Sequence, residues 1–208
     1  TVPEAFAYPL PDAFSDVSAA PLLGAGIIGY RALKRCAMPA CGTLALFGFG
    51  SSAHIVFQIA KHRGHKLFIV SRGGPHQQLA REMGADWAGA EAAGMPCKVD
   101  GGIIFAPAGQ LVPPALTMLR KGGALALAGI HMSDIPTLNY EQHVFYEKDI
   151  RSVTANTRED GRQLLAEAAE IPIAPHTTEY PLQDANRALQ DLKANKIGGS
   201  GVLQLTEP

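Results

Sequence analysis

Short apolar runs alternate with amphipathic segments along most of the chain. The apolar runs, which are rich in Leu, Ile, Val and Ala, predict strands at 43–47, 66–70, around Trp87, 101–105, 124–128 and 150–153. Between them, apolar residues at helical spacing predict helices at 51–63, 76–83, 113–120 and 158–169. Strands that are apolar on both faces and alternate with helices indicate a parallel sheet covered on both sides. The predicted fold class is therefore α/β, a doubly wound parallel sheet in three αβα layers.

The two ends of the chain depart from this alternation. Residues 1–16 are rich in Pro and aromatic residues, which predicts an extended lead-in. Ser15 or Asp16 is expected to cap a short helix that ends at residue 20. A second helix is expected to begin at Pro21 and to run over 22–35. At the C-terminal end we expect an amphipathic helix over 182–195 and a strand over 201–205.

The turn after the first strand carries the clearest motif. The strand ends in Gly48-Phe49-Gly50, and a helix then opens with Ser51 and Ser52. Gly48 permits a tight turn, and Gly50 allows a pyrophosphate to approach the backbone without meeting a Cβ. The free N–H groups and the dipole at the start of the helix suit phosphate. We interpret the segment as the start of a Rossmann-type dinucleotide-binding unit.

The end of the second strand bears on the choice of cofactor. A fold that selects NAD usually places Asp or Glu about 20 residues beyond the glycine turn, where it binds the ribose hydroxyls. Here Ser71 and Arg72 occupy that place. A serine can donate a hydrogen bond to a 2′-phosphate and an arginine can bind it bidentately, so we predict NADP. The competing interpretation is a solvated arginine in a polar loop.

Small residues follow the fourth and fifth strands. Ala106 and Pro107 come after one strand, and Gly129 and Ile130 come after the other. Because ligands of parallel sheets bind at the carboxyl ends of the strands, these positions leave room for the nicotinamide half of a dinucleotide. The competing interpretation is that they are ordinary loop residues.

Composition narrows the function classes. The chain has 208 residues, enough for one domain or a domain plus a fragment, and a net charge of −1 that gives no argument for nucleic-acid binding. Its three cysteines show no C-x-x-C spacing and no apolar run is long enough to span a bilayer, so we expect a cytoplasmic protein without membrane contact. It begins with Thr1 rather than Met, which is compatible with a piece of a longer protein.

Several motifs in order resemble one family. They are Ala19-Ala20-Pro21-Leu22-Leu23, Gly29-Tyr30-Arg31-Ala32-Leu33, Gly48-Phe49-Gly50, Met83-Gly84-Ala85-Asp86 and Lys121-Gly122-Gly123. Together they are similar to the zinc-containing alcohol dehydrogenases of the medium-chain dehydrogenase/reductase superfamily. The resemblance implies hydride transfer between a nicotinamide cofactor and an alcohol or carbonyl substrate. It also implies that the backbones of Ala106, Pro107, Gly129 and Ile130 line the nicotinamide ribose.

The resemblance covers only part of such an enzyme. It implies the end of a GroES-like catalytic domain at 1–40, an NADP-binding domain at 41–172 and a C-terminal return segment at 173–208. Most of the catalytic domain, with the first catalytic zinc ligands, is absent. The family cysteine that binds catalytic zinc is replaced by Gly24, which has no ligating side chain. Zinc is therefore expected in the full-length family but not in this chain.

No catalytic residue can be assigned from the sequence. None of the histidines has zinc-site spacing, and we interpret them, His54 included, as surface or hydrogen-bonded residues. His131 is the best exception because it follows the fifth strand. We expect the cofactor-binding part of an NADP-dependent alcohol dehydrogenase or aldehyde reductase. The alternatives are a non-catalytic dinucleotide-binding module and a zinc-free quinone or enoyl reductase relative.

Residues 135–140 predict how the chain assembles. The segment Ile135-Pro136-Thr137-Leu138-Asn139-Tyr140 is typical of an edge strand with Pro near its start. In the family that the chain resembles, this region pairs with its symmetry mate. We therefore expect a homodimer through this edge.

Overall fold

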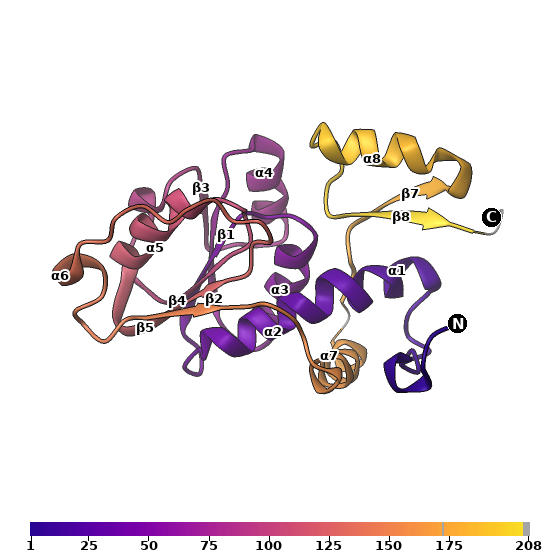
Figure 1. Cartoon of the computed structure of the whole chain (residues 1–208), viewed down its shortest axis with the longest axis horizontal. Coiled ribbons are helices and arrows are strands. Elements are labelled where there is room, and N and C mark those ends of the chain that lie inside the picture. Colours follow the sequence, from indigo (N-terminus) through magenta and orange to yellow (C-terminus); the bar gives the residue numbers. More distant parts are fainter. Residues whose placement is uncertain (172, 206–208) are drawn as a thin grey trace.

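The computed structural model describes residues 1–171 and 173–205; the other residues of the expected segments 41–172 and 173–208 lie outside this range. Its centre is a six-stranded sheet (Figure 1). Every pairing in this sheet is parallel, and the strand order is β3-β2-β1-β4-β5-β6. The strands are β1 (Thr43–Phe47), β2 (Lys66–Val70), β3 (Trp87–Gly89), β4 (Val99–Ile104), β5 (Leu119–Leu127) and β6 (Asp149–Ser152). This order is that of a Rossmann fold and confirms the predicted fold class.

Helices cover both faces of the sheet, because alternate residues of each central strand point to opposite sides. Leu44 and Leu46 of β1 belong to one apolar core, whereas Phe47 belongs to the other. The first core lies under α2 (Ile27–Cys36), α3 (Ser51–His62), α4 (Gly74–Glu82) and α7 (Arg158–Glu170). The second lies under η3 (Ala92–Gly94) and α5 (Val112–Met118), with η4 (Gly109–Leu111) leading into α5.

The helices before the sheet form one continuous run rather than two. After η1 (Glu4–Phe6), Ser15 caps α1 (Asp16–Pro21) by accepting a hydrogen bond from the Ser18 N–H, as predicted. Pro21 ends this helix instead of beginning the next one, so the expected break is wrong. Its φ of −64° is helical, and a π-helical turn, η2 (Leu22–Gly26), continues directly into α2.

The predicted edge strand at 135–140 is also wrong. Residues 135–139 of the described chain make no strand pairing, and α6 (Tyr140–His143) begins where the strand was expected to end. The Asn139 side chain accepts a hydrogen bond from the Gln142 N–H, so this residue is a helix cap. The two edge strands of the sheet are β3 and β6, and β6 pairs with β5.

The Lys121-Gly122-Gly123 segment falls between the helix predicted at 113–120 and the strand predicted at 124–128, but it lies inside β5. The positive φ of Gly122, +72°, and a shift in the pairing of β4 with β5 mark the bend there. The strand consequently begins several residues earlier than its apolar run.

The C-terminal residues form a separate unit of structure beside the sheet (Figure 1). β7 (Thr177–Pro181) pairs in parallel with β8 (Ser200–Gln204), which confirms the last predicted strand. η5 (Leu182–Asp184) and α8 (Ala185–Lys193) connect the two strands. β7 was not predicted, because Thr-Thr-Glu-Tyr-Pro has too little apolar character. Within the described residues, no helix has the length and apolar character needed to cross a membrane.

Candidate dinucleotide site

The glycine turn adopts a backbone that few other residues could adopt. Gly48 has a φ of +89°, and its N–H donates to the carbonyl oxygen of Val70 at 2.8 Å. A Cβ at this position would lie 3.2 Å from the backbone nitrogen of Ala106. Both the left-handed conformation and the close approach therefore require glycine here.

The turn leads into a helix whose first N–H groups are available. Gly50 is the N-cap of α3, and no side chain among the described residues caps the helix. Nothing in the described structure lies within 4 Å of a Cβ built on Gly50, so the backbone is open there. Ser51 and Ser52 are the first two helical residues, and their N–H groups precede the first helical hydrogen bonds. This arrangement suits an anion such as pyrophosphate.

A cleft of about 370 Å³ adjoins this helix start. Its lining includes Pro21, Ser51, Ser200 and Val202, so it lies between α1, α3 and β8. The hydroxyl groups of Ser51 and Ser200 are hydrogen-bonded to each other across it. β8 thus lies against the predicted cofactor site, a contact that no local sequence pattern predicts.

The ends of three neighbouring strands meet at Ala106. Its N–H donates to the carbonyl oxygen of Phe47 at 3.2 Å, which joins the ends of β4 and β1. A Cβ on Gly129 would lie only 2.8 Å from the Ala106 carbonyl oxygen, which brings the end of β5 to the same place. Pro107 is exposed and Ile130 is 76% exposed, so both are free to contact a ligand. The structure therefore brings Gly48, Ala106 and Gly129 together.

Ser71 and Arg72 lie at the corresponding end of β2, which is the neighbour of β1. Ser71 is buried, and its N–H donates to the Gly89 carbonyl oxygen at 2.9 Å. Arg72 is exposed, and its side chain makes no hydrogen bond or ion pair with the part of the chain that the structure describes. The guanidinium is thus available to a ligand at the carboxyl ends of the strands, where the glycine turn also lies.

His54 is fully buried, one helical turn after Gly50. Its Nδ1 lies 3.2 Å from the Gly50 carbonyl oxygen, and its Nε2 lies 2.9 Å from the backbone nitrogen of His176. Burial lowers its pKa, and the nearby His176 contributes in the same direction. His54 was predicted to be a surface or a hydrogen-bonded residue; it is hydrogen-bonded but does not lie on the surface. The contact with His176, 122 positions away, leaves no signal in the local sequence.

The residues present do not fit a catalytic zinc site. Gly24 is exposed in the π-helical turn, and nothing described lies within 4 Å of a Cβ built there. Across residues 1–171 and 173–205, no group of three or more His, Cys, Asp or Glu side chains could hold a metal ion. His131 is exposed and has a φ of +55° after β5, without a ligand set around it. Catalytic zinc requires three protein ligands, which this arrangement does not provide.

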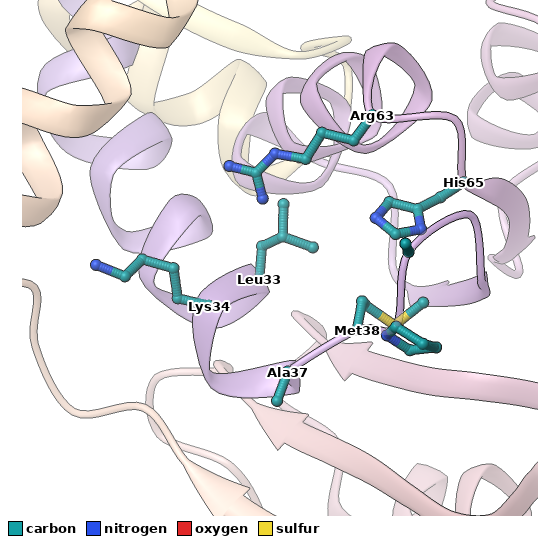
Figure 2. A pocket seen from close by; sticks show the side chains of 8 residues that line it. Leu33, Lys34, Ala37, Met38, Arg63 and His65 are labelled. Carbon is teal, nitrogen blue, oxygen red and sulfur yellow. The ribbon is translucent and has the colours of Figure 1, made fainter.

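A second cleft, of about 490 Å³, is lined by residues that come just before β1 and β2, so it lies at the opposite end of these strands from the glycine turn. Figure 2 shows the side chains that line it. It is formed by residues near the C-terminal ends of α2 and α3, including Leu33, Met38, Arg63 and His65. α3 is about 18 Å long, so this cleft is remote from the glycine turn. There the Arg63 guanidinium makes a bidentate ion pair with Glu167: its Nε donates to Oε1 at 2.7 Å and its Nη2 donates to Oε2 at 2.6 Å. Although burial opposes ionisation of Glu167, the arginine holds the pKa of this carboxyl group below its usual value.

Comparison with known sequences supports the resemblance noted above. Residues 53–170 match the family model described as zinc-binding dehydrogenase. A probable alcohol dehydrogenase, AdhA, of Mycobacterium tuberculosis is 52% identical over 203 residues, which cover 98% of the chain and 59% of that protein. An alcohol dehydrogenase of Geobacillus stearothermophilus is 28% identical over 95% of the chain and 60% of its own length. The chain thus spans about three-fifths of these relatives.

Solved structures show the same fold. A cinnamyl alcohol dehydrogenase of Sorghum bicolor superimposes with a TM-score of 0.88 at 21% identity, over 100% of the chain and 62% of that protein. A CAD of Helicobacter pylori complexed with NADP(H) gives a TM-score of 0.78 at 20% identity, over 89% of the chain and 54% of that protein. An acetophenone reductase of Geotrichum candidum in complex with NAD gives a TM-score of 0.84 at 20% identity, over 94% of the chain and 58% of that protein. At these identities the likeness concerns the fold alone.

Proposed function

Because this chain belongs to the zinc-binding dehydrogenase family, we propose that it is the cofactor-binding part of a medium-chain alcohol dehydrogenase that prefers NADPH to NADH. The observation that carries the proposal is the exposed guanidinium of Arg72, which makes no hydrogen bond or ion pair with the described residues and follows β2, the neighbour of the strand that ends in the open glycine turn. The substrate would be an alcohol or the corresponding carbonyl compound, as in the family.

Each part of the dinucleotide has a set of residues to hold it. The N–H groups around Gly50, Ser51 and Ser52 would bind the pyrophosphate, with Gly48 shaping the turn. The backbones of Ala106, Pro107, Gly129 and Ile130 would line the nicotinamide end. The bound cofactor would supply or accept a hydride at its nicotinamide ring.

The preference for NADPH rests on charge at the end of β2. A carboxylate there would repel a 2′-phosphate, but the chain offers Ser71 and Arg72 instead. Arg72 can bind a phosphate with two parallel hydrogen bonds, and the Ser71 hydroxyl can donate a third. A solvated Arg72 without a ligand is the competing interpretation.

The division of the chain also belongs to this proposal. Residues 1–40 and 173–208 would belong to the catalytic domain of the whole protein, and residues 41–172 to the cofactor domain. Gly24 and the lack of a metal-binding cluster among the described residues favour a second candidate function, a dinucleotide-binding module without catalysis. A zinc-free quinone or enoyl reductase is the corresponding enzymatic alternative.

The test is an Arg72→Ala variant titrated with NADPH and with NADH. Loss of a charge-assisted hydrogen bond costs about 1.5–3 kcal/mol, so NADPH affinity is expected to fall roughly ten- to a hundredfold. NADH affinity should change far less, because NADH has no 2′-phosphate. Arg162→Ala, which removes an exposed arginine of α7, is the matched control and should leave both affinities unchanged. Equal losses for the two cofactors in the Arg72 variant would contradict the proposed preference.

A further inference from the structure

The imidazole of His54 has a defined tautomer. Its Nδ1 faces the carbonyl oxygen of Gly50, which can only accept a hydrogen bond, at 3.2 Å. Its Nε2 faces the backbone N–H of His176, which can only donate, at 2.9 Å. The proton of the neutral ring therefore belongs on Nδ1, and Nε2 is the acceptor. Both ring nitrogens are satisfied although the side chain is fully buried.

The bond to Gly50 fixes one peptide of the glycine turn. The Gly50 carbonyl oxygen also accepts the backbone N–H of His54 at 3.1 Å, so two donors from one residue hold it. In a planar trans peptide the next N–H points away from the preceding carbonyl group. With the Gly50 carbonyl group directed into α3, the N–H of Ser51 points out of the helix start. That direction is where a pyrophosphate would bind.

The bond to His176 in turn holds the ring. Gln58, one helical turn further along α3, bonds the same return segment: its side chain accepts from the Ala174 N–H at 2.9 Å and donates to the Ala174 carbonyl oxygen at 3.2 Å. Gln58 therefore anchors the segment without touching the glycine turn. His54 differs in contacting both the segment and the turn.

We propose that His54 is a positioning residue for cofactor binding: by donating from Nδ1 to the Gly50 carbonyl oxygen, it aligns the Ser51 N–H with the pyrophosphate of the dinucleotide. The inference rests on the proposed function, because it assumes that a dinucleotide binds at the glycine turn. It concerns the pyrophosphate, which NADPH and NADH share, and so it is independent of the proposed role of Arg72.

Two substitutions separate the two bonds of His54. In His54→Asn, the side-chain amide can place an N–H near the position of Nδ1, so the bond to Gly50 can be kept. In His54→Gln, the longer side chain can place an acceptor near Nε2, so the bond to His176 is kept while the donor to Gly50 is lost. Gln58→Leu is the matched control, because it removes two hydrogen bonds to the return segment and Gln58 makes neither of the ring contacts of His54.

The experiment is titration of the 208-residue chain and these variants with NADPH and NADH, with thermal unfolding recorded for each. His54→Gln is expected to weaken both cofactors about tenfold and by the same factor, as one lost hydrogen bond implies. His54→Asn and Gln58→Leu should remain within about threefold of the unaltered chain. Equal weakening by Gln58→Leu and His54→Gln, or unchanged affinity in His54→Gln, would overturn the inference.

Nuclear magnetic resonance of the unaltered chain provides a measurement that does not depend on the folding of a variant. The ring nitrogens of His54 should show a protonated Nδ1 and an unprotonated Nε2, and the Ser51 amide should shift on addition of NADPH. An Nε2-protonated ring or an unmoved Ser51 amide in the bound state would overturn the inference. If the unaltered chain binds neither dinucleotide, the proposed function fails and this inference fails with it.

Discussion

At the scale of single residues, neighbouring glycines of the turn have different roles. Gly48 combines a positive φ with a close approach to Ala106, so the fold itself requires it. Gly50 has a φ of −96° and open space around the position of a Cβ, so the fold does not require glycine there. The reason for Gly50 must therefore come from what approaches the turn.

This contrast gives a paired prediction. Gly48→Ala should lower the free energy of unfolding by about 1–3 kcal/mol, because a left-handed backbone and a contact with Ala106 both oppose a side chain. Gly50→Ala should change it by less than about 0.5 kcal/mol but weaken NADPH binding. Chemical denaturation and cofactor titration measure the two effects. A stability loss at Gly50 as large as that at Gly48 would contradict this assignment.

The buried His54 also predicts a dependence of stability on pH. Burial holds its pKa below the ordinary value of about 6.5, so between the two pKa values the unfolded chain binds more protons than the folded chain. The free energy of unfolding should therefore fall as the pH drops from 7 through about 6.5 toward the folded-state pKa.

His65 is shifted in the same direction by burial, so the comparison must isolate His54. His54→Asn removes one titrating group and retains His65 and His176, so its stability should fall less steeply over the same pH interval. Denaturant titrations at several pH values measure both slopes. Identical slopes for the two proteins would show that the His54 pKa is the same in the folded and unfolded chains.

The residue scale also shows what local sequence can predict. The tight turn at Gly48 and the helix start after Gly50 were predicted because such a turn requires particular residues next to one another in the sequence. The bonds of His54 to His176 and of Ser51 to Ser200 were not, because they join α3 to a segment more than 100 positions away. Such contacts depend on how the ends of the chain pack, and no periodicity records them.

At the scale of elements, the sequence pattern predicted the bounds well for strands that are buried on both faces and for helices that bury one apolar stripe. β1 and β2 have the predicted bounds because each is almost wholly apolar. The segments around Pro21 and at 135–140 were not predicted well. Pro21 is compatible with the end of one helix as well as with the start of another, and Asn139 caps a helix instead of extending a strand.

A buried carboxylate, that of Asp160, links α7 to α2. Asp160 accepts hydrogen bonds from the N–H and hydroxyl of Thr157 in a capping box, and it pairs with Lys34 of α2 at 2.9 Å. Arg31 lies 3.7 Å from the same carboxyl group. Burial acts to raise the pKa of Asp160, but the hydrogen bonds from Thr157 and Lys34 hold it below its usual value.

Asp160→Ala should therefore lower the free energy of unfolding by about 1–3 kcal/mol, through loss of the cap and of the ion pair. The neighbouring Glu159→Ala is the control. Glu159 contacts only exposed side chains of its own helix, so its loss should cost less than about 0.5 kcal/mol. Denaturant unfolding of both variants checks this, and equal costs would show that the bonds of Asp160 add no stability.

At the scale of the whole molecule, several large apolar side chains are exposed on the surface of the described chain. Ile135 is 41% exposed and Tyr140 is 68% exposed, within the segment proposed to join two copies. Leu138 packs against the second core, so it is unsuited to testing an interface. A homodimer through 135–140 remains a prediction, now without the strand geometry first expected for it.

Light scattering tests this assembly. The unaltered chain should have the mass of a dimer, and Ile135→Lys should shift it toward the monomer because a buried lysine would lack a partner. Val2→Lys, at an apolar residue that is 72% exposed in the lead-in, should leave the mass unchanged. A monomer at high concentration for the unaltered chain would contradict the assembly.

We propose that the chain is an NADPH-preferring cofactor domain, and the ratio of its dissociation constants for NADPH and NADH tests this preference. Titration of the unaltered 208-residue chain with each cofactor, under the same buffer and salt, gives this ratio. Contacts from Ser71 and Arg72 to a 2′-phosphate predict that NADPH binds roughly ten- to a hundredfold more tightly. Equal affinities, or tighter binding of NADH, would contradict the proposed preference for NADPH.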